Sequence, residues 1–85
     1  GNIFAEDAQI QEIQALEKLL RACDDTDLKI IKCLLINEPY NKTGDLLYIS
    51  ESSVKYRIKR MLSNSGITTT AKILELYTKY IGKNE

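Results

Sequence analysis

Three side chains in the second half of the sequence could read a DNA duplex. Lys55 and Lys59 can donate hydrogen bonds to the O6 and N7 acceptors of guanine. Tyr56 can stack on a sugar or meet a thymine methyl group while its hydroxyl bonds a phosphate. Residues 52–62 around them contain no acidic side chain. The alternative is a solvated face on a structural helix, but such faces usually mix lysine with glutamate, so this run favours contact with a polyanion.

An amphipathic helix over about residues 50–65 must position these side chains. Ser50 is the expected N-cap, Glu51 is favourable beside the positive end of the helix dipole, and Gly66 suits the left-handed position that ends the helix. At about 3.6 residues per turn, the segment separates an apolar side from a polar one. The apolar side consists of Val54, Ile58, Met61 and Leu62. The opposite side carries Tyr56, Ser52, Lys59 and Ser63, flanked by Lys55 and Arg57.

A helix-turn-helix is predicted around this element. A short helix is expected at about residues 41–47, and Tyr48 with Ile49 makes the turn into the basic helix. Gly44 falls where the two helices cross, a position that requires a small side chain. The angle between the helices would be filled by Leu47, Ile49, Val54 and Ile58.

The remaining sequence predicts three further helices, and therefore an all-α fold of five helices without a strand. They are expected at about residues 5–23, 28–36 and 70–81, the last one capped by one of three consecutive threonines, Thr68 to Thr70. We expect a linker or brace helix in residues 1–25 and one DNA-binding domain in residues 26–83. Asp24, Asp25 and Asp27 are expected to be solvated carboxylates on a capping turn.

The role of the first helix is open from the sequence. Its apolar stripe is Ile10, Ile13, Leu16 and Leu20. Ile3 and Ile10, like Ile13 and Leu20, are seven residues apart, but Glu17 interrupts the seam. A linker to another domain, a coiled-coil arm and a brace against the domain are all compatible with this pattern, and a linker or brace is favoured.

The charge of the chain is divided unevenly. The 85 residues carry 12 basic and 12 acidic side chains. Residues 1–49 hold five basic and nine acidic side chains, a net charge of −4, and residues 50–85 hold seven and three, a net charge of +4. A net charge of zero argues against a protein that binds any polyanion. A basic patch on an otherwise acidic protein still indicates a local binding site for an anionic partner.

Neither catalysis nor a cofactor is indicated. The chain has no histidine, and Cys23 and Cys33 do not have the spacing of metal ligands, so they are expected to be buried structural thiols. No glycine-rich phosphate loop and no apolar run long enough to span a membrane are present. A non-enzymatic protein in the cytoplasm, without a metal, is therefore expected.

Residues 27–82 resemble the LuxR/NarL-type (GerE-like) DNA-binding domain of bacterial transcription regulators. The resemblance is carried by Asn41-Lys42, Leu47, Ile49-Ser50-Glu51, Ser53-Val54-Lys55, Ile58, Met61-Leu62 and Gly66-Ile67. Two segments differ from the usual pattern, and the N-terminal half is also unusually acidic. Thr43-Gly44 stands where members commonly have Ile-Ala, and Thr68 to Thr70 replaces basic residues that would contact a phosphate.

The resemblance implies a role for each residue of the basic helix. Bases would be contacted by Lys55, Tyr56 and Lys59, and phosphates would lie near Ser50, Ser52, Ser53, Arg57 and Arg60. If about four cations neutralise phosphates, log affinity should fall against log salt with a slope of about −3 to −4. The family also implies a nucleoid-associated transcription regulator, often a response regulator, whose receiver domain would precede residue 1.

The last helix has two possible uses. Its apolar face, formed by Ile73, Leu76, Tyr77 and Tyr80, exceeds what one small core needs, so burial and self-association are both open. Tyr40 and Tyr48 are likewise expected in the core or at an interface. The resemblance implies a homodimer through this helix, bound to two half-sites. The rival hypothesis is a protein-interaction module that keeps the helix-turn-helix fold but has lost DNA binding.

Overall fold

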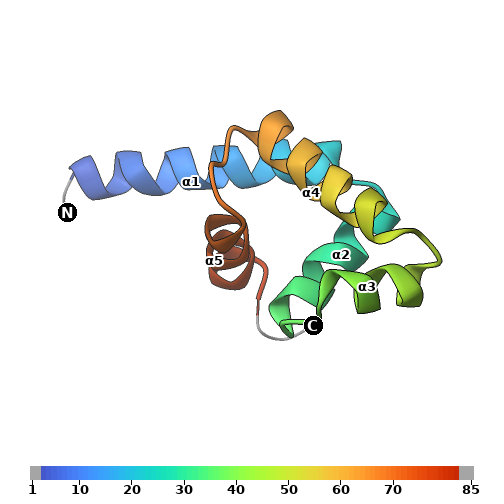
Figure 1. Cartoon of the computed structure of the whole chain (residues 1–85). Helices are drawn as coiled ribbons and strands as arrows, with labels where there is room; N and C mark the ends of the chain where they lie inside the picture. The colour runs from blue at the N-terminus through green and yellow to red at the C-terminus, as the bar shows by residue number, and fades with distance from the viewer. Residues whose placement is uncertain (1–2, 83–85) are drawn as a thin grey trace.

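The computed structural model describes the backbone of residues 3–82 and the side chains of residues 6–82, and this part of the chain contains five α-helices and no strand. The helices are α1 (Ile3–Ala22), α2 (Asp25–Leu35), α3 (Tyr40–Leu47), α4 (Glu51–Ser65) and α5 (Thr70–Tyr80). Helices α2 to α5 form a compact body, and α1 runs along it and extends beyond it at the N-terminal end (Figure 1). The predicted all-α class is confirmed.

Local capping sets the helix ends. The Ser50 hydroxyl accepts a hydrogen bond from the Ser53 backbone N–H at 3.0 Å, and Gly66 ends α4 with a φ of 76°. Thr69 is the N-cap of α5. These ends agree with the prediction. Helix α2 begins three residues earlier than expected, because Asp24 and Asp27 form a reciprocal capping box across its first turn.

The close crossing of α3 and α4 depends on Gly44. A Cβ atom added to Gly44 would lie 2.6 Å from the backbone oxygen of Ile49 and 3.3 Å from the carbonyl carbon of Ser50. Neither backbone atom can move without shifting the start of α4. Tyr48 makes the turn in the left-handed conformation, with a φ of 60°, and its side chain is 95% exposed. Tyr48 therefore does not belong to the core, whereas Tyr40 packs against it.

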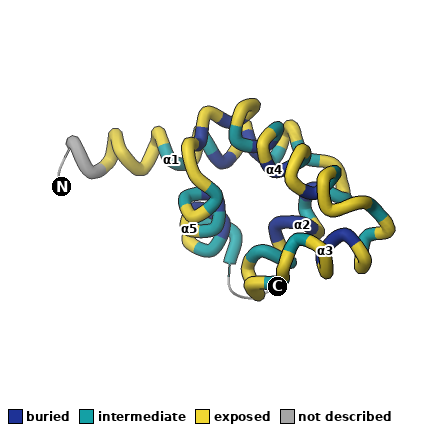
Figure 2. Tube along the Cα trace, viewed as in Figure 1, coloured by how far each residue is buried: buried dark blue, intermediate teal, exposed yellow. Residues whose placement is uncertain are grey.

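The core is shared by all the helices except α3, whose partly buried side chains pack against its edge. It consists of Leu16, Leu19, Ile30, Ile31, Val54, Ile58, Met61, Ile67, Ile73, Leu76 and Tyr77. The dark-blue buried stretches in Figure 2 face the interior from α1, α2, α4 and α5. Because burial of these apolar side chains is the main driving force for folding, α1 contributes to the stability of the body rather than standing apart from it.

The apolar side of α1 enters the core only near its C-terminal end. Leu16 and Leu19 are buried, but Ile10 is 53% exposed and Ile13 is also exposed. Ile10 and Ile13 of the predicted stripe therefore do not belong to the core. The N-terminal end of α1 extends beyond the body (Figure 1). The side chain of Ile3 lies outside the described residues. A brace accounts for the packing of α1 on α4 and α5.

The predicted dimer face of α5 lies inside the chain. Ile73, Leu76 and Tyr77 are buried, and Tyr80 is half-buried beside α1. Of the two uses left open by the sequence, these residues take the first, and the assignment of Ile73, Leu76 and Tyr77 as a dimer surface is corrected. The physical reason is that α1 supplies the apolar partner that a second subunit would otherwise provide.

The two cysteines are free and only half-buried, so the prediction of buried thiols holds in part. Burial, together with the charge of Asp27 and Asp24, raises the pKa of Cys23 to about 11. This thiol stays protonated at neutral pH and is a poor nucleophile. Within residues 3–82, none of the helices combines the length and the apolarity that crossing a bilayer would require.

Candidate nucleic-acid interface

The outer side of α4 presents the three side chains predicted to contact bases. Val54, Ile58 and Met61 hold the inner side of the helix in the core. Lys55 and Lys59 are exposed, and Tyr56 is 64% exposed although it is aromatic. The structure therefore brings the predicted base-contacting residues together on one accessible surface.

The lysines on this surface are held loosely. Lys55 Nζ lies 3.1 Å from a carboxylate oxygen of Glu51, one helical turn earlier, and both side chains are about half exposed. Exposed pairs of this kind contribute about 0.3–0.5 kcal/mol and are screened by salt. Within the described chain, no carboxylate lies within ion-pair distance of the Lys59 ammonium group. Both lysines can therefore turn toward an approaching phosphate or base edge.

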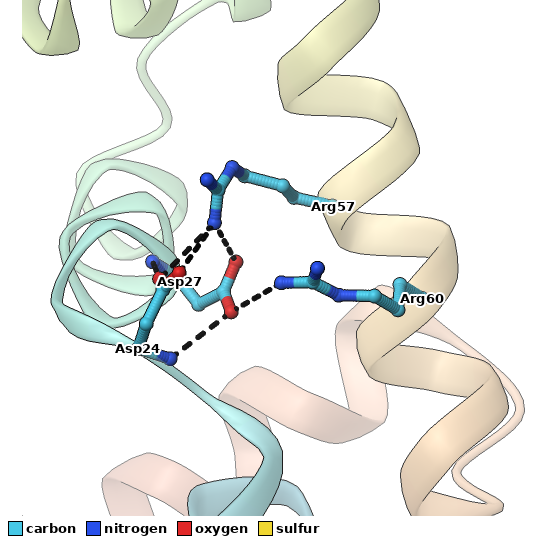
Figure 3. A network of polar contacts seen from close by, with 4 residues as sticks. All are labelled: Asp24, Asp27, Arg57 and Arg60. Atoms are coloured by element: carbon cyan, nitrogen blue, oxygen red, sulfur yellow. Dashed lines mark hydrogen bonds and ion pairs between the residues drawn. The ribbon is translucent and has the colours of Figure 1, made fainter.

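The arginines of α4 are held tightly by α2, as Figure 3 shows. Arg57 Nη1 donates to both carboxylate oxygens of Asp24, at 3.1 and 2.9 Å, and to Asp27 Oδ1 at 3.0 Å. Arg60 Nη2 donates to Asp27 Oδ2 at 2.8 Å. We call these four residues the Asp–Arg cluster. It joins the middle of α4 to the first turn of α2.

Burial in the Asp–Arg cluster is uneven. Asp27 is fully buried, so the expectation of a solvated carboxylate at this position is wrong, whereas the Asp24 side chain is 56% exposed. Both oxygens of Asp27 accept hydrogen bonds, including one from the Asp24 backbone N–H at 3.1 Å. A buried carboxylate is tolerated when its oxygens are paired in this way.

The Asp–Arg cluster pairs two carboxylates with two guanidinium groups, and its two exposed-side members favour each other's charged forms. The Asp27 backbone N–H, and after it the Arg57 guanidinium, lower the pKa of Asp24 to about 2. Asp24, and then Asp27, raise the pKa of Arg57. In formal charge the two carboxylates balance the two guanidinium groups. The predicted phosphate contacts of Arg57 and Arg60 find no support in this arrangement, since both groups already have anionic partners.

The serines predicted near phosphates lie at the start of α4. The Ser50 hydroxyl caps the helix and donates to Ser53 Oγ at 2.9 Å, so these two hydroxyls are engaged with each other. Ser52 is exposed, and its hydroxyl lies 3.1 Å from that of Ser50. Ser52 is the best placed of the three to meet a phosphate.

A second carboxylate–cation cluster, not predicted from the sequence, joins α1 to α5. Glu12 accepts hydrogen bonds from the Tyr80 hydroxyl at 2.7 Å, from Lys79 at 3.0 Å and from Lys72 at 3.2 Å. In that order of importance, these contacts lower the pKa of Glu12 to about 2. We call this group the Glu12 cluster. The only signal for it in the sequence is the excess of acid in one half and of base in the other.

The electrostatic surface of α4 is therefore smaller than its composition indicates. Two lysines with Tyr56 remain for an anionic ligand, because the two arginines serve the fold. Comparison of the chain with protein-family models, with curated proteins and with solved structures found no significant match.

Proposed function

We propose that this chain binds duplex DNA through the outer side of α4, with Lys55, Tyr56 and Lys59 reaching base edges in the major groove. The observation that carries the proposal is the exposure of these three residues on one side of a helix whose other side is fixed in the core. The 15 residues of α4 make a rod about 22 Å long, and the major groove admits an α-helix of this kind.

The arrangement of α3 and α4 supports the same proposal. A short helix followed by a turn and a longer helix with a polar outer side is the pattern of a helix-turn-helix. Gly44 brings the end of α3 against the start of α4, which leaves the outer side of α4 uncovered. The resemblance of residues 27–82 to LuxR/NarL-type domains adds the role: a transcription regulator of the bacterial cytoplasm.

A dimer on two half-sites remains part of the proposal, but with a different surface. The outward side of α5 carries Ala71, Leu74 and Thr78, which line a shallow groove together with Leu35 of α2. These residues, rather than the buried ones, would have to form any contact between two copies through α5.

Fluorescence anisotropy on a random duplex at several salt concentrations tests the proposal. On a random duplex, which offers no preferred site, the two lysines would contact phosphates instead of base edges. One phosphate neutralised by each lysine gives a slope of about −1.8 in log affinity against log salt. The double variant Lys55→Ala/Lys59→Ala should lose most of this slope. Lys29→Ala/Lys32→Ala removes the same charge from exposed positions of α2 and is the matched control. If both double variants bind alike, α4 is not the DNA-binding element.

The rival function is a protein-interaction module that has lost DNA binding. The observation that favours it is the Asp–Arg cluster, because it withdraws two of the four cations of α4 from any nucleic acid. Affinity for duplex that is independent of salt, in the wild type and in both double variants, would decide for this module.

A further inference from the structure

We propose that Asp24 sets the DNA affinity of this chain by occupying Arg57, which becomes available to a backbone phosphate once the charge of Asp24 is removed. The inference rests on the proposed DNA binding. It assigns to Asp24 a role in binding strength in addition to its role as the N-cap of α2.

The contact between Asp24 and Arg57 lies at the protein surface. One guanidinium nitrogen, Arg57 Nη1, lies 2.9 and 3.1 Å from the two Asp24 oxygens. The side chain of Asp24 is 56% exposed and that of Arg57 is 25% exposed. Water, and therefore an anion from solution, can reach this part of the Asp–Arg cluster, whereas Asp27 is fully buried.

A DNA phosphate and the Asp24 carboxylate would compete for the Arg57 guanidinium group. Arginine bonds both groups through charge-assisted hydrogen bonds of similar geometry. Arg57 directly follows Tyr56 and lies at the edge of the outer side of α4, opposite to the edge that carries Lys55. A phosphate that flanks the groove bound by α4 would meet Asp24 already in place, and the negative charge of Asp24 would repel it.

The charge of Asp24 can be removed while residue 24 still caps the start of α2. Asp24 Oδ1 accepts the Asp27 backbone N–H at 2.9 Å, and an asparagine oxygen can accept the same bond. Asparagine and aspartate are about equally good N-caps. Asp24→Asn therefore changes the formal charge of the Asp–Arg cluster from zero to +1. Asp27 still bonds both Arg60 and Arg57, so the Arg57 guanidinium stays in place, with further N–H donors that can turn to a phosphate.

The experiment measures anisotropy on the same random duplex for the wild type, Asp24→Asn and Asp25→Asn. If Arg57 neutralises one additional phosphate, the slope becomes steeper by about 0.9, and the advantage of Asp24→Asn over wild type grows about 3.5-fold between about 200 and 50 mM salt. Asp25→Asn removes the same charge at the next position, which is also exposed, and should leave the slope unchanged. Equal gains in both variants would overturn the inference.

A double-mutant cycle with Arg57→Gln separates Arg57 from a general effect of charge. In the Arg57→Gln background, Asp24→Asn should no longer steepen the slope. The inference fails if Asp24→Asn steepens the salt slope even without Arg57, or if Asp24→Asn alone does not steepen it. The contact between Asp24 and Arg57 would then serve the fold alone. Asp24→Ser, which also keeps an N-cap side chain, replaces Asp24→Asn if that variant unfolds, as judged by circular dichroism.

This design keeps the inference separate from the proposed function. If the wild type binds through Lys55 and Lys59 but Asp24→Asn gains nothing, the inference fails and the proposed function stands. If the wild type does not bind and Asp24→Asn gains binding that depends on Arg57, the inference stands and the native DNA-binding function fails. Absence of binding in every variant overturns both.

Discussion

The two flanks of α4 contain the same kind of charge but are used differently. On one flank, Lys55 is exposed and only loosely paired with a neighbour on its own helix. On the other, Arg57 bonds two carboxylates of α2. The lysine flank is available to a ligand, and the arginine flank fixes the helix in the body.

This difference shows that cations counted along a helix are not equivalent to cations on its surface. Arginine suits the fixed flank because its planar guanidinium offers several donors to paired carboxylates at once. Lysine suits the open flank because its ammonium group keeps its hydration and its freedom until a ligand arrives. Three substitutions test this comparison: one removes a partner of the arginine flank, one shifts α4 with both flanks, and one leaves both flanks in place.

The largest loss of stability is expected from Asp27→Ala, which removes the buried carboxylate that Arg57 and Arg60 bond. The change leaves Arg57 and Arg60 without their buried partner and removes half of the capping box of α2. The two arginines left behind are partly exposed, and Arg57 keeps Asp24, so the cost is that of the lost charged hydrogen bonds, about 1.5–3 kcal/mol each in the free energy of unfolding. Urea denaturation should show a much lower midpoint than for the wild type.

The matched control is Asp25→Ala, at an exposed position in the same turn. Its free energy of unfolding should stay within about 1 kcal/mol of the wild-type value, because only a helix-dipole contact is lost. If Asp27→Ala behaves like this control, the arginine flank does not stabilise the fold.

An intermediate effect is expected from Gly44→Ala, which displaces both flanks together. The added methyl group meets the backbone of Ile49 and Ser50, so α4 must shift relative to α3. Overpacking costs about 1–3 kcal/mol, of which about 1 kcal/mol is recovered from the better helix propensity of alanine. Urea denaturation and duplex anisotropy should both show a loss.

Gly66→Ala provides the comparison for Gly44→Ala. At Gly66 a Cβ would have nothing within 4 Å, but the φ of 76° disfavours an L-residue. This variant should lose about 1 kcal/mol of stability and keep its DNA affinity, because the position of α4 does not change. Unchanged DNA affinity in Gly44→Ala as well would mean that the crossing angle does not matter for binding.

The smallest effect is expected from Glu12→Gln, in a cluster remote from both flanks. The pKa of Glu12 is lowered from 4.5 to about 2, so the charged carboxylate stabilises the folded state above about pH 4.5. This contribution is lost as the pH falls from about 4.5 to about 2, because the folded protein must then bind a proton at a group it holds charged.

The stability difference between wild type and Glu12→Gln should therefore shrink over this acidic range. Urea denaturation at a series of pH values measures it, and DNA affinity at neutral pH is the control that should not change. A stability difference independent of pH would show that the Glu12 charge does not hold α1 against α5.

Much of the local structure of this chain is predictable from its sequence. Ser50, Thr69 and Gly66 mark helix ends because a cap bonds backbone groups within three or four residues of itself. The side of α4 that is buried follows from helical periodicity for the same reason. The early start of α2 was missed because Asp24 and Asp27 also match an ordinary solvated turn.

The partners of the charged residues could not be predicted. The bonds of Arg57 and Arg60 to α2 join residues 30 to 33 positions apart, and those of Glu12 to α5 join residues 60 to 68 apart. Nothing in the local pattern distinguishes the paired Arg57 from the exposed Lys59. The local pattern also could not show whether Ile73, Leu76 and Tyr77 pack in the core or form a dimer interface, because an apolar helix face suits both.

The sequence by itself determined five helices, the caps of α4 and α5, the glycine at the crossing of α3 and α4, and the amphipathic character of α4, because each depends on contacts within one or two helical turns. Only the tertiary structure decided which cations of α4 stay open, what covers α5, and that α1 joins the core. These outcomes depend on how the helices pack, since packing alone brings Asp24 and Asp27 to one flank of α4 and leaves Lys55, Tyr56 and Lys59 exposed.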